Sequence, residues 1–228
     1  TTGAMAVTTN LAVDFSALTG ANTFNFAAAT ANAVGFTGGS GVDTVTDSVV
    51  GGNVIPAGAG NDIINLTDKT GGAGTTVVTG GAGADTVNVS MIGNTAIDAM
   101  KFIFAAGDSV SDTSTTGISA TLTDTVAGLD GATLAAAAGS QAEFDTEVAA
   151  TAVTTGGAVS LGTTTVTNAG DFYINIVNAT TAYIYQDTDG DKVIESGEFA
   201  VALTGVATDT LLAADFTIAG GDLILATT

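Results

Sequence analysis

One stretch occurs three times in the first half of the chain, as Gly38-Gly39-Ser40-Gly41-Val42-Asp43-Thr44-Val45, Ala57-Gly58-Ala59-Gly60-Asn61-Asp62-Ile63-Ile64 and Gly80-Gly81-Ala82-Gly83-Ala84-Asp85-Thr86-Val87. The shared pattern is GGxGxDxU, where U is an apolar residue. Weaker copies start at Gly51 and Gly71, so the pattern recurs about every nine residues, with insertions. A repeat of this length predicts a solenoid in which each copy adds half a turn.

The repeat fits one half-turn of a parallel β-roll, a glycine-rich turn followed by a short strand. Val45, Ile64 and Val87 would then point into a thin core, and successive turns would stack about 4.8 Å apart. Glycine lets turn carbonyls face a cation, and aspartate adds a carboxylate. The alternative is an ordinary Gly-Asp turn, which a single copy would favour but three copies in phase do not. The repeats therefore predict Ca²⁺ sites that contribute directly to folding.

The predicted ligands of the roll are turn glycines and the polar residues that follow them. They are Gly39, Gly41, Asp43, Asn53, Gly58, Gly60, Asp62, Gly81, Gly83, Asp85 and, beyond the last repeat, Asp108. The pattern weakens on both sides of this region. Residues 20–26 predict a capping coil with Asn22 in the Asp position, and residues 101–104 predict a strand that leaves the roll.

A second acidic segment follows the spacing of an EF-hand calcium loop. It reads Asp187-Thr188-Asp189-Gly190-Asp191-Lys192-Val193-Ile194-Glu195-Ser196-Gly197-Glu198. The predicted ligands, at positions 1, 3, 5, 7, 9 and 12 of the loop, are Asp187, Asp189, Asp191, Val193, Glu195 and Glu198. Position 6, where glycine normally makes the sharp turn, is Lys192. The flanks predict strands, so we expect a strand-loop-strand calcium site; the alternative is a solvated acidic hairpin turn without metal.

Composition excludes several classes of function. The 228 residues include 23 acidic and 3 basic side chains, for a net charge of −20, and no His or Cys. Without these two residue types there is no Ser-His-Asp or Cys-His nucleophile pair and no His/Cys zinc site, so we expect no enzyme. Three lysines cannot neutralise a nucleic-acid backbone or an anionic membrane. The chain is 46% hydrophobic, which disfavours disorder, and no apolar run is long enough for membrane insertion.

The expected fold class is mainly β, a parallel β-roll followed by a smaller β-rich domain with one or two short helices. We place the roll at residues 1–112 and the second domain at 113–228. Helices are predicted at residues 131–138 and, from the capping-box pattern Ser140-Gln141-Ala142-Glu143, over the residues that follow. Alternating apolar residues predict strands, mainly antiparallel, at 159–166, 172–177, 182–185, 199–203 and 223–225.

These repeats resemble the RTX family, the calcium-binding nonapeptide repeats of bacterial type I-secreted proteins. The order of segments around them is similar to the C-terminal region of type I-secreted S-layer proteins, as in Caulobacter. It runs from Val13-Asp14-Phe15 before the repeats to Tyr183-Ile184-Tyr185 and Ala202-Leu203-Thr204-Gly205 near the end. The resemblance implies secretion, folding outside the cell with Ca²⁺, and self-assembly on the bacterial surface. It also implies an uncleaved secretion signal at residues 215–218 and 222–228, read by the type I apparatus.

Three functions fit this sequence. The first is the assembly and secretion region of an S-layer subunit, a structural protein whose partners are other copies of itself. The second is the distal domain of an RTX adhesin. The third is the secretion tail of an RTX exoenzyme whose catalytic part lies elsewhere. The irregular spacing of the repeats favours the S-layer subunit, with Ca²⁺ as its cofactor.

Overall fold

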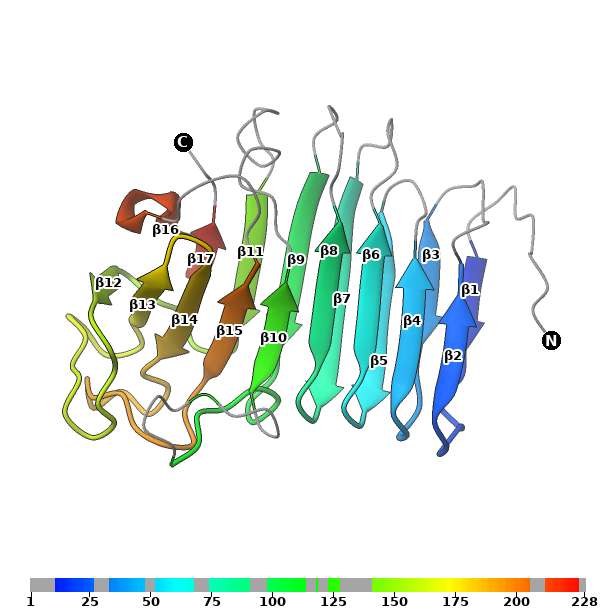
Figure 1. Ribbon diagram of the computed structural model, residues 1–228, viewed down its shortest axis with the longest axis horizontal. Helices are drawn as coiled ribbons and strands as arrows, with labels where there is room; N and C mark the ends of the chain where they lie inside the picture. Colours follow the sequence, from blue (N-terminus) through cyan, green and yellow to red (C-terminus); the bar gives the residue numbers. More distant parts are fainter. Residues whose placement is uncertain are drawn as a thin grey trace.

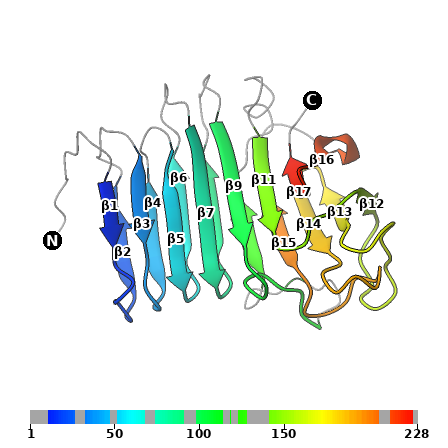
Figure 2. The same ribbon diagram turned by 180° about the vertical axis from the view of Figure 1, so that it is seen from behind.

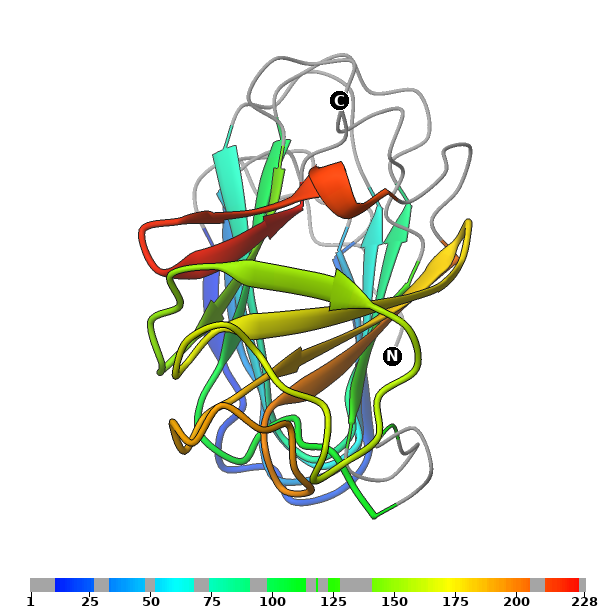
Figure 3. The ribbon, with the colours of Figure 1, turned by 90° about the vertical axis from the view of Figure 1, so that its left-hand side faces the viewer.

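The protein is nearly all β-structure, as the sequence predicts. The computed structural model describes residues 11–26, 33–47, 52–67, 74–90, 98–113, 118, 123–127, 141–205 and 212–225. Two sheets face each other along the whole length of the molecule (Figures 1 and 2). Seen along its long axis, the later strands lie in front of the solenoid and are turned relative to its strands (Figure 3).

The chain alternates between the two sheets, so that each turn of the solenoid adds one strand to each. One sheet takes its strands in the order β1 (Leu11–Asp14), β3 (Val34–Thr37), β5 (Val54–Ala59), β7 (Gly74–Ala82), β9 (Asp98–Phe104), β11 (Gln141–Thr146), β17 (Asp222–Leu225) and β16 (Phe216–Ala219). The other begins with β2 (Asn22–Asn25), β4 (Asp43–Asp47), β6 (Ile63–Thr67), β8 (Thr86–Ser90) and β10 (Asp124–Ala127). Neighbouring strands from β1 to β11 and from β2 to β10 are parallel, which confirms the predicted parallel β-solenoid. Strand β17 is antiparallel to both β11 and β16.

The apolar residues of the repeats form a column in the core. Val45 lies beside Ile64, Ile64 beside Val87, and Val87 beside Val126. All four are buried and belong to one cluster. Across from them, the other sheet contributes Phe36, Ile55, Val78, Phe102 and Phe144 to the same cluster. Each repeat therefore buries its apolar residue by stacking on its neighbours rather than by folding alone.

The predicted capping coil is present at the first turn. Asn22 lies beside Asp43, in the position that aspartate takes in the repeats, and Phe24 lies beside Val45. The Phe15 and Phe24 rings stack with centroids 4.4 Å apart, and Phe24 packs against Phe36 at 4.8 Å. Three aromatic rings thus close this end of the core.

Strand β9 does not leave the roll, so that prediction is wrong. It lies between β7 and β11 and pairs with both in parallel. Residues 141–146 are β11 rather than a helix, because Ala142 and Phe144 alternate into the core while Glu143 faces Lys101 of β9. The helix predicted at residues 131–138 lies outside the described residues.

The second sheet continues past β10 into the C-terminal part. It adds β15 (Ala200–Thr204), β14 (Thr181–Gln186), β13 (Phe172–Asn178) and β12 (Val153–Gly156). The predicted strands at 172–177, 182–185 and 199–203 are confirmed, and β13, β14 and β15 are antiparallel. Strand β15 pairs with β10 in parallel. The hydrogen-bonded sheet of the solenoid thus continues into strands beyond the predicted domain boundary at residue 112. The boundary itself stays a prediction.

Residues 159–166 contain a turn at residues 161–163 and no strand, so the strand predicted there is wrong. The Ser160 carbonyl oxygen accepts hydrogen bonds from the N–H groups of Thr163 and Thr164, and the Thr164 hydroxyl accepts one from Ser160 N–H. These local bonds compete with strand pairing. Thr165 forms an isolated bridge to Val193, and backbone hydrogen bonds link Gly162, Thr164 and Val166 to residues 192–194.

The last three described elements are a single 3₁₀ turn, η1 (Ala213–Asp215), and the strands β16 and β17. Strand β17, predicted at 223–225, lies between β11 and β16; residues 226–228 lie outside the described residues.

Candidate metal centre

The aspartates of the three repeats form a buried column at one edge of the solenoid. Each stands where a glycine-rich turn enters a strand of the second sheet: Asp43 begins β4, Asp62 precedes β6 and Asp85 precedes β8. The Asp43 N–H donates to Asp62 Oδ1 at 2.7 Å, and the Asp62 N–H donates to Asp85 Oδ1 at 2.7 Å. Asp62 and Asp85 therefore each use one oxygen to hold the backbone of the preceding turn, whereas Asp43 Oδ1 accepts from the Asn22 side-chain amide at 2.9 Å.

The second oxygen of these carboxylates is the unusual feature. Asp43 Oδ2 accepts a hydrogen bond from Gly39 N–H at 3.2 Å, but Asp62 Oδ2 and Asp85 Oδ2 are buried without a hydrogen-bond partner. Both residues are only 1% exposed. A buried carboxylate oxygen without a donor costs free energy unless a cation or a proton neutralises it.

Burial and mutual repulsion raise the pKa values along the column. Burial raises the pKa of Asp62 to about 6, with a further contribution from the Asp43 charge. Burial raises the pKa of Asp85 to about 7, and the charges of Asp62 and Asp108 add to it. Near neutral pH the carboxylates of the metal-free column therefore still bind protons in part. A divalent cation would neutralise the same oxygens.

The turn glycines stack in two columns beside the aspartates. Gly39, Gly58 and Gly81 form one, and Gly41, Gly60 and Gly83 the other. A Cβ added at Gly81 would clash with the Gly58 carbonyl oxygen, and one at Gly58 with the Gly39 carbonyl oxygen. Gly58 and Gly81 also have φ values of 114° and 96°, which residues with a side chain rarely adopt. Turn carbonyls thus lie in rows next to the carboxylates, the oxygen environment that Ca²⁺ takes.

Two predicted ligands lie apart from this column. Asn53 is on the other sheet, just before β5, where its Oδ1 accepts a hydrogen bond from Val34 N–H at 2.8 Å. It plays the same backbone-holding part as the aspartates, in the other sheet. Asp108 follows β9, and its Oδ2 accepts from Ala105 N–H at 2.9 Å in a turn.

The acidic loop forms a second candidate site, between β14 and β15. Carboxylate oxygens of Asp187, Asp189 and Asp191 lie within 4.8 Å of one another, so these three could hold a metal ion. Asp187 is fully buried; its Oδ1 accepts from Gly190 N–H at 2.8 Å and its Oδ2 from Lys192 N–H at 3.0 Å. The flanking strands agree with the predicted strand-loop-strand arrangement.

The remaining predicted ligands border this group of three. Glu198 is buried, with Oε1 accepting from Thr188 N–H at 2.7 Å and Oε2 from Glu195 N–H at 2.8 Å. Burial raises the pKa of Glu198, and the Asp187 charge adds to the effect. Val193 bridges to Thr165 and its N–H donates to Asp191 Oδ1 at 2.8 Å. The Glu195 side chain is exposed.

Lys192 has the backbone conformation that this loop normally gives to glycine. Its φ is 74°, and within the described ranges no other residue except glycine has a positive φ. The loop therefore keeps the sharp turn of the EF-hand pattern at position 6 despite the side chain. The Lys192 ammonium donates to the Thr167 carbonyl oxygen at 3.4 Å, which anchors the loop to the preceding segment.

Sequence reasoning missed a third acidic group, on the outer face of the first sheet. Glu143, Asp145 and Asp222 surround Lys101, whose Nζ lies 2.6 Å from Glu143 Oε1 and 2.6 Å from Asp145 Oδ2. Hydrogen bonds to Asp145 and Glu143 raise the pKa of Lys101. This group has its own internal cation, so it does not need a metal. Pairing of β11 with β9 on one side and with β17 on the other brings these residues together, and nothing local in the sequence signals it.

Comparison with known proteins does not assign the chain. No family model matches the sequence, and no curated protein matches it at a significant level. Within the described ranges, no helix has the length and apolar character that crossing a membrane requires. The geometry supports a β-solenoid compatible with an RTX β-roll and acidic groups that could hold a metal ion.

Proposed function

We propose that this chain is a calcium-folded structural segment of a bacterial S-layer protein that is exported by a type I apparatus. The observation that carries the proposal is the buried aspartate column, in which Asp62 Oδ2 and Asp85 Oδ2 have no hydrogen-bond partner. The resemblance of the repeats to the RTX family supports Ca²⁺ as the cation. The proposal assigns no catalytic role and no nucleic-acid partner.

Charge explains how the cation would control folding. At a net charge of −20, the metal-free chain repels itself, and this repulsion opposes compaction. The column brings several carboxylates into a buried edge, which adds a local penalty in the folded state. Cation binding offsets both the repulsion across the chain and the local penalty of the buried carboxylates. Because the column forms only when the turns stack, the free energy of cation binding adds to the free energy of folding. A chain that meets Ca²⁺ only outside the cell would therefore fold after export.

Self-assembly is the second part of the proposal. Within the described residues the two sheets end in β1 and β2 at one end and in β16 and β12 at the other. Such end strands have one hydrogen-bonding side without a strand partner, which suits contacts between copies. Together with the resemblance to S-layer proteins, this elongated shape supports lattice formation at the cell surface.

The test has two steps. Far-UV circular dichroism should show loss of the β signal in EGTA and its recovery with Ca²⁺ but not with Mg²⁺. Identical spectra in EGTA and in Ca²⁺ would remove the calcium-folding proposal. Negative-stain electron microscopy of the Ca²⁺-loaded protein should then show ordered sheets. Persistent monomers would favour an RTX adhesin domain or the secretion tail of an exoenzyme instead.

A further inference from the structure

The outer face of the second sheet carries a regular array of short, uncharged side chains. Strands β2, β4, β6, β8 and β10 lie side by side in register (Figure 1). Alternate residues of each strand point into the core, so the residues between them point outward in two rows. These two rows, called the outer array below, are Thr23, Thr44, Ile63, Thr86 and Thr125, and Asn25, Thr46, Asn65, Asn88 and Ala127.

Strand β10 belongs to this array although no GGxG sequence precedes it. The aspartate column shows the shared register. Asp124, which begins β10, accepts a hydrogen bond from the Asp85 N–H at 2.7 Å, as Asp85 does from the Asp62 N–H. The Asp124 N–H donates to Ser109 Oγ at 2.8 Å, and this hydroxyl ends the column. The outer array therefore extends past the three repeats.

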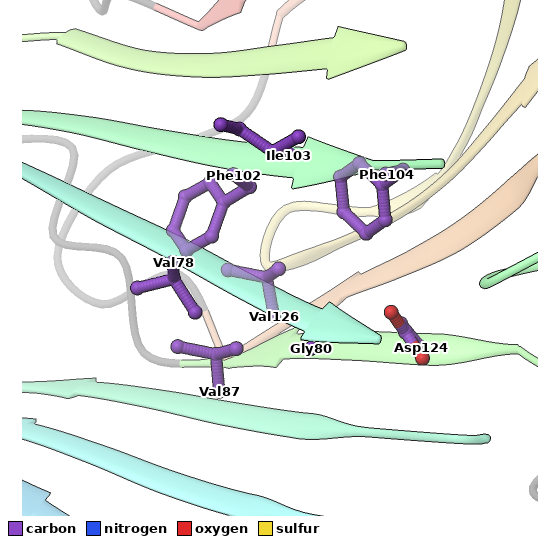
Figure 4. Close-up of a pocket in the computed structure, with 8 residues that line it drawn as sticks. All are labelled: Val78, Gly80, Val87, Phe102, Ile103, Phe104, Asp124 and Val126. Atoms are coloured by element: carbon purple, nitrogen blue, oxygen red, sulfur yellow. The ribbon is translucent and has the colours of Figure 1, made fainter. Parts of the chain in front are cut away.

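The inner side of these strands is filled by the core. Val87 and Val126 lie beside Val78 and Phe102 of the other sheet (Figure 4). The space between the side chains holds about one water molecule and is lined mainly by apolar groups. Binding of a partner by these strands must therefore use the outer array.

Hydrogen bonds between neighbouring strands order the second row of the array. Asn88 Nδ2 donates to Asn65 Oδ1 at 3.0 Å, and Asn65 Nδ2 donates to Thr46 Oγ1 at 3.5 Å. Side chains that are already ordered lose less conformational freedom when a partner binds. Hydroxyl and amide groups both donate and accept hydrogen bonds. The array therefore offers donors and acceptors that suit a second copy of itself.

Charge distinguishes the outer array from the opposite face of the molecule. None of the ten residues of the array is charged. The outer face of the first sheet carries Asp14 and the group in which Lys101 contacts Glu143 and Asp145. Two copies with a net charge of −20 each repel one another. They approach with the least repulsion where their faces hold no charge, which is at the outer array.

Ile63 gives the array an apolar centre. It is the middle residue of the first row, between Thr44 and Thr86, and it is 39% exposed. Two identical faces pair about a twofold axis, and a residue on that axis meets its counterpart in the other copy. An axis near Ile63 would bury this side chain against its counterpart and let the rows on either side overlap.

We propose that the outer array of one copy binds the outer array of a second copy, about a twofold axis near Ile63. This contact rests on the proposed self-assembly and names one of its faces. With strands about 4.8 Å apart and about 3.3 Å per residue, the array covers roughly 400 Å² on each copy. A stable dimer buries about 800 Å² on each partner. A single contact is therefore weak, and it becomes effective when many copies assemble together.

The first test places a charge at the centre of the array. Ile63→Glu should raise the protein concentration needed for assembly in Ca²⁺ by about tenfold or more, because like charges would face each other. Val54→Glu is the matched control. Val54 is 49% exposed on the outer face of the first sheet, and it directly follows Asn53 as Ile63 follows Asp62. This control should assemble like the wild type.

Light scattering measures the assembly concentration, and far-UV circular dichroism in Ca²⁺ checks that both variants keep the β signal. Assembly of Ile63→Glu at the wild-type concentration would refute the contact and leave self-assembly intact. Equal inhibition by the two variants would also refute it, because added charge would then act on either face. A wild-type chain that never assembles would overturn the assembly part of the proposed function itself.

A second test does not depend on tolerance of a buried charge. The chain has no cysteine, so Ile63→Cys adds a single thiol, and Val54→Cys is its control. Residues that meet on a twofold axis can bring their Cα atoms within the roughly 7 Å that a disulfide spans. Mild oxidation of the assembled protein should therefore give covalent dimers of Ile63→Cys on a non-reducing gel and few of Val54→Cys. Equal amounts of dimer from the two variants, or none from Ile63→Cys, would refute the twofold contact.

Discussion

Ser111 N–H donates a hydrogen bond to the carbonyl oxygen of Glu198 at 2.7 Å, although the two residues are far apart in the chain. The Ser111 hydroxyl also donates to the Glu195 carbonyl at 2.6 Å. Two residues earlier, the Ser109 hydroxyl accepts from Asp124 N–H and donates to the Ala200 carbonyl oxygen. A short segment therefore connects the end of the aspartate column with the acidic loop.

Replacing Ser109 should weaken this connection. Ser109→Ala leaves a buried N–H on Asp124 without its acceptor and the Ala200 carbonyl without this donor, a loss of about 1–3 kcal/mol in the free energy of unfolding. Urea unfolding in saturating Ca²⁺ measures it. Ser40→Ala is the matched control, because Ser40 is exposed and Ala59 and Ala82 stand at the same position in the other repeats. Equal stability of the two variants would contradict the connection.

Gly81 should tolerate no side chain. Gly81→Ala would force a methyl group against the Gly58 carbonyl oxygen at a φ of 96°, and we expect a loss of about 3 kcal/mol or more in stability. Gly107 separates the two causes, since its φ is 86° but open space surrounds it. Gly107→Ala should cost only about 1 kcal/mol. Thermal unfolding in Ca²⁺ compares them, and similar losses would mean that the turns do not stack closely.

Lys192 should reduce both the stability and the affinity of the acidic loop. Lys192→Gly removes an unfavourable φ of 74°, worth roughly 1 kcal/mol, together with the positive charge that directly follows Asp191 in the loop. We expect higher stability and tighter Ca²⁺ binding, measured by isothermal titration calorimetry. Lys192→Gln removes the charge but keeps the strain, so it should improve affinity with little gain in metal-free stability. Weaker binding in both variants would refute this role.

The metal-free and Ca²⁺-loaded proteins should respond to pH in opposite directions. Folding raises the pKa of Asp62 to about 6 and that of Asp85 to about 7, from an ordinary value of 3.8. Between these limits the folded state binds more protons than the unfolded state, so metal-free stability falls as pH rises from about 4 to 7. Protons compete with Ca²⁺ for the same oxygens, so the loaded protein should instead lose stability as pH falls. Far-UV circular dichroism in EGTA, where the β signal should fade as pH rises, and denaturant unfolding in Ca²⁺ test the two directions.

Periodic features of the fold were accessible from the sequence. The stacked positions of Val45, Ile64 and Val87 follow directly from the repeat, because equal spacing places equivalent residues in register. The turn at Lys192 likewise follows from a known loop spacing. Both features follow from motifs that are each contained in a short stretch of the chain.

Features that depend on distant pairing were missed. The capping-box pattern at residues 140–143 favours a helix locally, but β11 gains a hydrogen-bonded partner in β9 and buries Phe144 against Phe102, whose rings are 5.4 Å apart. The sequence does not predict that Asp124 belongs to the aspartate column, because its Asp-Thr-Val sequence lacks the glycines that mark the repeats. Its place in the column appears only when β10 is seen beside β8.

Strand β17 lies between β11 and β16, with Leu223 and Leu225 fully buried. In the proposed export route, this same segment is part of the signal that the secretion apparatus reads. A transporter can read the side chains only while the strand is still unpaired. Folding outside the cell would therefore bury the signal. An exported molecule, once folded, could then not bind the secretion apparatus again.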